Sequence, residues 1–270
     1  MPQHDAPTAS DLEVIVLGAG PAYSDTPGAV GSAFLVRGAG SALVLDLGQG
    51  TFAALAQAIE PSSIEAVAIS HLHPDHFIDL IPLRHYLCRM EFQPSRRLRL
   101  LAPMGIEQRL DGVYDQPGFT RSAFDVEAMT PALERIGPFD LEVRRVRHAG
   151  ESFAFRAQLR GRPGPGLVYS GDVSQAEDLR TLIHAGDLLL SEATFGTGPV
   201  PASMPHLDGP GVGRLARETG AGQVVLVHIR MGCDPAATLA SAEREFAGPI
   251  SLGRPNDRFP VTVAGTSLAT

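Results

Sequence analysis

Three histidines and one aspartate lie close together in the segment SHLHPDH at positions 70–76. The apolar run before it, Ala66–Ile69, is bounded by polar residues and predicts a short buried strand. A turn at the end of a strand can direct alternate side chains to two points, which suits two metal ions about 3.5–4 Å apart. The segment therefore predicts two pairs of metal ligands, His71 with His73 and Asp75 with His76.

Two or three ligands per ion are too few for a complete site, so the pattern predicts further ligands elsewhere in the chain. Three polar residues stand at the carboxyl ends of apolar runs in the second half: His148, Asp172 and His228. Open α/β sheets place their functional sites at this end of their strands. A carboxylate at Asp172 would bridge the two ions and offset their mutual repulsion. The competing interpretation is a polar turn with isolated core or surface histidines, which explains His228 alone better than it explains the whole set.

The composition indicates a folded chain with a sizeable core. Of the 270 residues, 44% are apolar and 19% are charged, a composition that disfavours disorder. The formal net charge of −8 disfavours nonspecific nucleic-acid binding. No stretch approaches the ~18 consecutive apolar residues of a membrane span, and residues 1–11 do not resemble a signal peptide. Cys88 and Cys233 match no disulfide framework, so we expect free thiols and a cytoplasmic location.

Strand and helix signals alternate along the chain. The predicted strands are Glu13–Leu17, Ser32–Val36, Ala42–Asp46, Ala66–Ile69, Leu98–Ala102, Leu141–His148, Phe153–Leu159, Gly166–Tyr169, Leu188–Ser191 and Val224–Val227. The predicted helices are Phe52–Ile59, Phe77–Met90, Gly105–Tyr114, Ala176–Ala185, Pro210–Thr219 and Pro235–Phe246. Strand hairpins mixed with helices indicate a layered α/β fold rather than a helix bundle. We expect a flexible lead-in over residues 1–11 and a single domain over residues 12–270.

The segment HLHPDH matches the HxHxDH signature of the metallo-β-lactamase-fold hydrolases, and the resemblance extends over nearly the whole chain. It implies a four-layer αββα sandwich with metal in a cleft between two sheets. The implied cofactors are two divalent metal ions, with zinc expected and manganese or iron as alternatives for these ligand types. The implied ligand set is His71, His73 and His148 for one ion, Asp75, His76 and His228 for the other, and Asp172 as the bridge.

Other segments resemble the phosphodiesterase branch of this superfamily, which includes ribonuclease Z. They are VLGAGPAYSDTPGAVGSAFLV, LDLGQGT, and LLLSEATF followed by His206 and later by LVHI. Glu192 and His206 resemble the pair that this branch uses near the scissile phosphate. The alternative is that Glu192 is a structural carboxylate at a strand end and His206 a loop histidine.

Only 23 residues separate His148 from Asp172, the interval in which ribonuclease Z inserts a long arm that grips transfer RNA. The missing arm disfavours transfer-RNA processing and favours a small phosphodiester. The segments HLHPDHFIDL, GESFAFR, YSGD, SEATF and AEREFAGP resemble the short bacterial atypical class II cyclic-nucleotide phosphodiesterases. A small phosphodiester such as a cyclic nucleotide is therefore the expected substrate.

The expected mechanism begins with a water shared by two metal ions, which loses a proton near neutral pH to give a bridging hydroxide. Asp75 would orient or deprotonate this nucleophile. His206, held by Glu192, would stabilise phosphate charge or protonate the leaving oxygen. Three alternatives stay open: an endonuclease acting on RNA 3′ ends, a hydrolase of a lactone or thioester, and a metal-binding sensor without turnover. A homodimer is one assembly that the sequence leaves open.

Overall fold

Apolar runs form two seven-stranded sheets in the computed structural model, which describes residues 12–89, 97–204 and 206–261. Sheet A has the order β14-β1-β2-β3-β4-β5-β6, and sheet B has the order β13-β12-β11-β10-β9-β8-β7. Sheet A contains β1 (Glu13–Ala19), β2 (Ser32–Gly38), β3 (Ser41–Leu47), β4 (Ala66–Ala68), β5 (Leu98–Ala102), β6 (Phe124–Ala128) and β14 (Arg258–Pro260). Sheet B contains β7 (Leu133–Ile136), β8 (Phe139–Val146), β9 (Ser152–Leu159), β10 (Leu167–Tyr169), β11 (Leu188–Glu192), β12 (Gln223–Val227) and β13 (Ile250–Leu252).

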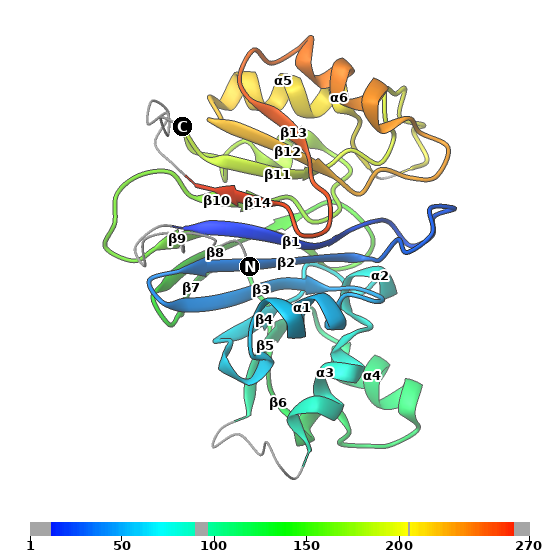
Figure 1. Cartoon of the computed structure of the whole chain (residues 1–270), viewed down its shortest axis with the longest axis vertical. Coiled ribbons are helices and arrows are strands. Elements are labelled where there is room, and N and C mark those ends of the chain that lie inside the picture. Colours follow the sequence, from blue (N-terminus) through cyan, green and yellow to red (C-terminus); the bar gives the residue numbers. More distant parts are fainter. Residues whose placement is uncertain (1–11, 90–96, 205, 262–270) are drawn as a thin grey trace, which may run out of the picture.

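Helices cover the outer face of each sheet (Figure 1). They are α1 (Phe52–Ala58), α2 (Pro74–Phe77), α3 (Leu80–Leu87) and α4 (Ile106–Tyr114) on sheet A, and α5 (Gly209–Thr219) and α6 (Pro235–Glu243) on sheet B. Leu55, Leu83 and Leu110 pack into the cluster beneath sheet A, whereas Val212, Leu215 and Ala242 pack into the cluster above sheet B. No helix in these described ranges is long and apolar enough to cross a membrane.

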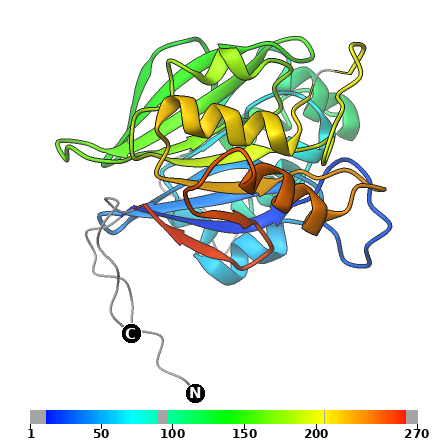
Figure 2. The ribbon, with the colours of Figure 1, turned by 90° about the horizontal axis from the view of Figure 1, so that it is seen from above.

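A third apolar cluster fills the space between the sheets, which form two separate layers in Figure 2. Phe34 of β2 in sheet A meets Tyr169 of β10 in sheet B, with ring centroids 4.9 Å apart. Helices, sheet A, sheet B and helices are therefore stacked as four layers. The αββα sandwich expected from the sequence resemblance is confirmed.

The functional end of the sandwich is defined by parallel strands. In sheet A, β3, β4 and β5 run parallel, and in sheet B, β10, β11 and β12 run parallel. The turns that follow β4 and β12 meet across the two sheets, because His228 Nε2 lies 3.3 Å from Asp75 Oδ2. The carboxyl ends of strands from both sheets thus face one another, where α/β folds commonly place their sites.

The helix predicted over Phe77–Met90 is shorter in the structure: α3 spans Leu80–Leu87, and α2 overlaps the predicted segment only at Phe77. The N–H of Asp79 donates to the carbonyl of Leu47 in β3 at 3.0 Å instead of continuing the helical ladder. The carboxylate of Asp79 accepts a hydrogen bond from the N–H of Phe52 at 2.8 Å. These tertiary partners interrupt the helix. Met90 lies outside the described residues.

The predicted helix Ala176–Ala185 is also wrong. A short 3-10 helix, Ala176–Leu179, is followed by turns. The N–H of Leu182 donates three residues back, to Leu179, and the N–H of His184 donates to the carboxylate of Asp187 at 2.8 Å. The N–H of Ile183 makes one α-helical bond, to the carbonyl of Leu179, and the bond from His184 to Asp187 ends the ladder there.

The sequence pattern does not predict β6, β7, β13 and β14, which are the edge strands of the two sheets. An edge strand is covered on fewer sides, so its apolar pattern is weaker than that of a central strand. β13 is half-buried throughout, and β14 is exposed at both ends. The expected lead-in over residues 1–11 lies outside the described residues.

The interval between His148 and Asp172 contains only sheet structure and turns. Its 23 residues comprise β9, β10, and the connecting residues 149–151, 160–166 and 170–171. No long arm extends from this part of the chain, as the residue count requires.

Candidate metal centre

Three imidazoles and one carboxylate converge on a first point. His71 and His73 follow β4, His148 follows β8, and Asp172 follows β10. His71 Nε2 lies 2.9 Å from His73 Nδ1, which lies 3.4 Å from His148 Nε2. Asp172 Oδ2 lies 3.7 Å from His71 Nε2 and 3.7 Å from His148 Nε2. His148 was expected at the end of its strand, but β8 ends at Val146, so His148 lies in the turn beyond it.

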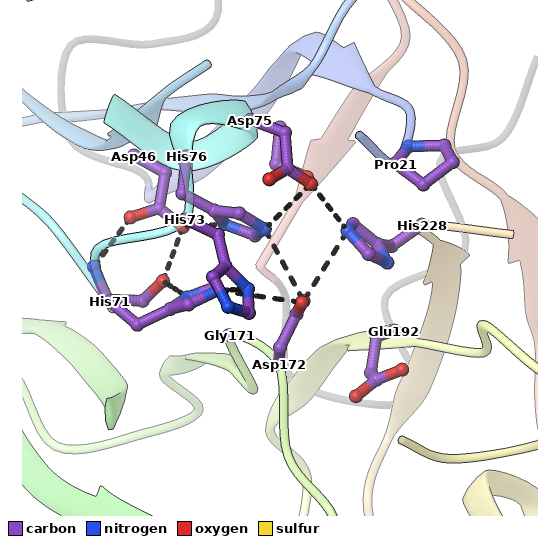
Figure 3. A network of polar contacts seen from close by, with 12 residues as sticks. Pro21, Asp46, His71, His73, Asp75, His76, Gly171, Asp172, Glu192 and His228 are labelled. Atoms are coloured by element: carbon purple, nitrogen blue, oxygen red, sulfur yellow. Dashed lines mark hydrogen bonds and ion pairs between the residues drawn. The ribbon is translucent and has the colours of Figure 1, made fainter. Parts of the chain in front are cut away.

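A second group of donors lies beside the first (Figure 3). Asp75 Oδ2, from α2, lies 3.6 Å from His76 Nε2 and 3.3 Å from His228 Nε2. Asp172 Oδ1 lies 3.5 Å from His76 Nε2 and 3.6 Å from His228 Nε2. Asp172 therefore presents one carboxylate oxygen to each group.

The donor spacing fits two metal ions. Four ligands placed tetrahedrally at zinc–nitrogen distances of 2.0–2.1 Å lie about 3.3 Å from one another. Eight donor pairs of the two groups lie 2.9 to 3.7 Å apart. The donor atoms within each group all lie within 4.8 Å of one another. Among the described residues, His76 Nε2 and Asp172 Oδ1 are buried without a hydrogen-bond partner. Buried polar atoms without partners are uncommon, and these two belong to the second group.

The charges around the cluster favour a cation. Burial alone would lower the pKa of His76, but the carboxylates of Asp172 and Asp46 outweigh it and raise that pKa well above the ordinary value. Burial would raise the pKa of Asp172, but the surrounding imidazoles, His228 and His76 foremost, hold it well below the ordinary range. Burial lowers the pKa of His71 well below its usual value, which keeps this ring neutral, as metal ligation requires. The negative electrostatic potential that favours a proton on His76 also favours a metal ion.

Hydrogen bonds orient three of the imidazoles with Nε2 toward the cluster. His76 Nδ1 donates to Asp46 Oδ2 at 2.7 Å. Ser70 Oγ donates to Asp46 and can then accept from His71 Nδ1, 3.1 Å away. Thr194 Oγ1 donates to Glu192 and can accept from His228 Nδ1, 2.9 Å away. Each arrangement leaves the lone pair on Nε2, the tautomer that a metal ligand needs.

Asp46 is the main residue that the sequence analysis missed. Besides His76 it accepts hydrogen bonds from the N–H of Ser70 at 2.6 Å and from the hydroxyl of Tyr169 at 2.6 Å. Burial and the charge of Asp46 raise the pKa of Tyr169 well above its usual value, so the phenol stays protonated and donates. Asp46 ends the predicted strand Ala42–Asp46, so the strand-end rule that identified Asp172 could have found it. Thr194 has no comparable signal in the sequence.

The backbone brings these side chains together by close contact. A Cβ added to Gly48, after β3, would lie 1.8 Å from the carbonyl oxygen of Asp75, so a glycine is needed for α2 to approach β3. Pro74 starts α2, where its missing N–H is tolerated. His228 has a φ of 56°, in the left-handed region, and its N–H donates to the carbonyl of Ala19. A non-glycine residue held in this strained conformation commonly marks a functional site.

His206 and Glu192 form a pair beside the donor groups. His206 Nδ1 donates to the Glu192 carboxylate, with the two oxygens 3.0 and 3.1 Å away. Burial lowers the pKa of His206, but its hydrogen bond to Glu192 and that residue's charge outweigh burial and raise the pKa above the ordinary value. Asp172 Oδ2 lies 3.9 Å from His206 Nδ1. All nine residues singled out from the sequence thus lie in one connected cluster: His71, His73, Asp75, His76, His148, Asp172, Glu192, His206 and His228.

The chain is similar to known proteins over most of its length. Residues 44–229 match the family model described as a beta-lactamase superfamily domain. An uncharacterized protein of Mycobacterium tuberculosis is 30% identical over 228 residues, which cover 83% of this chain and 82% of that protein. The ribonuclease Z of Myxococcus xanthus is 27% identical over 272 residues, which cover 82% of this chain and 89% of that enzyme.

Solved structures share the fold. The metallo-beta-lactamase fold protein YhfI from Bacillus subtilis matches with a TM-score of 0.81 at 21% identity, covering 93% of this chain and 99% of YhfI. A diphosphatase from the PhnP family matches with a TM-score of 0.73 at 17% identity, covering 94% of this chain and 99% of the diphosphatase.

Proposed function

The chain belongs to the beta-lactamase superfamily and is a metal-dependent hydrolase, and we propose that it uses two metal ions to hydrolyse small phosphodiesters such as cyclic nucleotides. The observation that carries the proposal is the position of Asp172. Its two carboxylate oxygens face separate donor groups, at 3.7 Å in the first and 3.5–3.6 Å in the second. A carboxylate in that position suits a bridge between two cations.

Each donor group would hold one of the two proposed metal ions. Zinc is the metal proposed, and manganese or iron would suit the same imidazole and carboxylate donors. When bound, two divalent cations neutralise phosphate charge and lower the pKa of a water between them, which supplies the nucleophile. One ion would be held by His71, His73 and His148, the other by Asp75, His76 and His228, with Asp172 shared.

Two further roles belong to side chains of this protein. Asp75 lies at the cavity that adjoins the site and would orient the attacking water or accept its proton. Burial opposes a charge on His206, but Glu192 more than compensates for it, so its raised pKa suits a proton donor to the leaving oxygen. Because Nδ1 of His206 is held by Glu192, Nε2 is the atom that can reach a substrate.

Phosphate is the proposed centre of reaction. The His206–Glu192 pair supports it, because it places a proton donor next to the donor groups. The names of similar proteins support it as well, since ribonuclease Z and a diphosphatase both act at phosphorus. A lactone or a thioester is the alternative substrate class, and its hydrolysis can be measured beside that of the diesters named below.

A small substrate is proposed over an RNA end. The 23 residues between His148 and Asp172 contain no long arm, and the cavity beside the site has a volume of about 360 Å³. This lies at the lower end of the ~300–1,000 Å³ of small-molecule sites. Both observations favour one nucleotide. The proposed location is the cytoplasm, which suits Cys88 and Cys233 as free thiols.

The first test is hydrolysis of 3′,5′-cyclic AMP and of bis(4-nitrophenyl) phosphate by protein loaded with zinc or manganese. Turnover that is absent from Asp172→Ala is the expected result. A metal-loaded wild type that hydrolyses neither diester would overturn the proposal.

A second candidate function, cleavage at RNA 3′ ends, is favoured by the similarity to the ribonuclease Z of Myxococcus xanthus, which spans 82% of this chain. Precursor transfer RNA with a 3′ extension is the discriminating substrate. Cleavage of this RNA at the same enzyme concentration that leaves cyclic AMP intact would replace the first proposal with the second.

A further inference from the structure

One cavity opens directly onto the donor groups, and its outer wall contains residues that are not proposed metal ligands. Its base includes Asp75, Asp172 and His228, and its volume is about 360 Å³. Tyr23 from the β1–β2 loop and Phe195 from the β11–α5 loop form part of its walls. Arg230, two residues after His228, completes the wall. The residues of this wall come from three loops on both sheets.

Arg230 is held in an unusual way. Its guanidinium carbon lies 4.5 Å from the centroid of the Phe195 ring. Among the described residues, its Nε is buried without a hydrogen-bond acceptor, and no carboxylate forms an ion pair with it. Buried donors without partners are uncommon in folded proteins. All other side chains that line the cavity lack a permanent positive charge.

The rest of the wall is aromatic and apolar. Phe195 is buried and supports both Arg230 and His206, whose ring centroid lies 6.2 Å away. Tyr23 is 65% exposed and Met204 is 45% exposed, although both are large apolar side chains at the cavity. Solvent-exposed aromatic surface next to a polar centre indicates a place where a flat apolar group binds.

This lining favours a nucleobase over a second phosphate. A second phosphate would need several cations or N–H groups, whereas the cavity has a single arginine and two carboxylates, Asp75 and Asp172. A nucleobase needs flat surfaces, and both aromatic rings and arginine guanidinium planes stack on bases. A guanidinium that is already packed on a ring is a preformed flat surface of this kind.

We propose that Tyr23, Phe195 and Arg230 form a nucleobase subsite, so that the substrate is a phosphodiester of a nucleoside rather than any small diester. The Arg230 guanidinium, supported by Phe195, stacks on one face of the base, and Tyr23 covers the other. This inference rests on the phosphodiesterase function proposed above and specifies the half of the substrate that does not react.

The test compares two substrates that differ only in the base: cyclic AMP and the methyl riboside 3′,5′-cyclic phosphate. Stacking on one aromatic partner is worth about a factor of ten or more. We therefore expect wild type to prefer cyclic AMP in kcat/KM. Tyr23→Ala and Arg230→Gln should each lower kcat/KM for cyclic AMP about tenfold and change the base-free substrate less than about twofold. Met231→Ala is the matched control, because Met231 is 46% exposed and does not line the cavity.

A charge-conserving variant separates stacking from attraction to phosphate. Arg230→Lys keeps the positive charge but loses the plane, so it should be as impaired on cyclic AMP as Arg230→Gln. Full activity of Arg230→Lys, or equal losses on both substrates, would overturn the subsite. Calorimetric titration gives a readout independent of turnover: AMP should bind more tightly than ribose 5-phosphate in wild type, and Tyr23→Ala should reduce this difference about tenfold.

The outcomes also separate this inference from the function on which it rests. Wild type that hydrolyses both cyclic substrates equally well contradicts the nucleobase subsite and leaves the phosphodiesterase in place. Wild type that hydrolyses no diester, including bis(4-nitrophenyl) phosphate, contradicts both.

Discussion

Asp172 is a buried carboxylate at the centre of the candidate metal centre. It is buried, it lies between imidazoles from both sheets, and its Oδ1 has no hydrogen-bond partner among the described residues. A carboxylate in such surroundings is stable only if positive charge offsets the loss of hydration. The five donors that face it supply that charge as protons or through metal ions.

Replacing Asp172 tests this view of the site. Asp172→Ala should lose bound metal after dialysis and reduce turnover to the background rate, because one side chain contributes to both donor groups. Metal content by atomic emission and hydrolysis of cyclic AMP measure the two effects. Retention of two metal equivalents by the folded variant would contradict the bridging role.

His206 should behave differently, because its Nδ1 donates to the carboxylate of Glu192, 3.0 and 3.1 Å away, and His206 is not among the proposed metal ligands. His206→Asn is expected to keep wild-type metal content and to lower kcat about 10²–10⁴-fold, the usual contribution of a positioned proton donor. Met231→Ala serves as control for handling and loading. A His206→Asn enzyme as fast as wild type would remove His206 from the mechanism.

At the scale of elements, the site depends on how closely α2 packs on the end of β3. A Cβ on Gly48 would lie 1.8 Å from the carbonyl oxygen of Asp75. Just after α2, the N–H of Asp79 donates to the carbonyl of Leu47 at the end of β3. The position of α2 determines where Asp75 and His76 point. A small displacement of α2 therefore changes the positions of Asp75 and His76 in the site.

Gly48→Ala is expected to displace α2, to cost about 1–3 kcal/mol in the free energy of unfolding, and to weaken metal binding. Gly112→Ala, in α4, is the matched control. No atom lies within 4 Å of its added Cβ, so this change should be neutral or stabilising by up to about 1 kcal/mol. Chemical denaturation and metal content distinguish the two variants. Wild-type stability and metal content in Gly48→Ala would show that α2 tolerates displacement.

A second network of contacts holds sheet B without touching the donors. The buried carboxylate of Asp187 accepts two hydrogen bonds from Arg156 of β9, at 2.7 and 2.9 Å, and others from the N–H groups of Gly166 and His184. Asp187→Ala should destabilise the protein by about 3–5 kcal/mol, because it leaves a buried guanidinium without its partner. Urea denaturation measures the loss, and the fraction that stays folded should bind metal normally. A loss of metal from folded protein would link this network to the site.

For the molecule as a whole, the candidate metal centre joins the two sheets. Four of its residues precede or begin the helices on sheet A, and three follow strands of sheet B: His148, Asp172 and His228. A ligand that binds only the folded state stabilises it by mass action. Bound metal should therefore act as a cross-link between the two halves of the sandwich.

Removal of metal by a chelator is expected to lower Tm by roughly 5–10 °C, if metal is present at about 100 times its Kd. Asp172→Ala should show no further decrease when the same chelator is added, because it has already lost the metal. Differential scanning calorimetry with and without chelator measures both. A stripped wild type that melts at the temperature of the loaded protein would contradict the cross-linking role.

The residue pattern alone predicts a layered α/β fold and a set of candidate donors, and the family resemblance predicts the αββα sandwich. His71, His73, Asp75 and His76 are adjacent in the chain, and His148, Asp172 and His228 follow apolar strands, a rule that needs no coordinates. Central strands were predictable because burial on both faces leaves long apolar runs. The single domain over residues 12–270 and the roles of the ligands stay predictions.

The orientation of the donors and their surroundings depend on contacts between distant parts of the chain. Asp46 and Thr194 reach their histidines across long intervals of sequence, and Arg230 packs on Phe195 from a different loop. The break at Asp79 depends on Leu47 of a distant strand. A local pattern registers periodicity and residue type, whereas these hydrogen bonds and packing contacts exist only after two sheets have closed on each other.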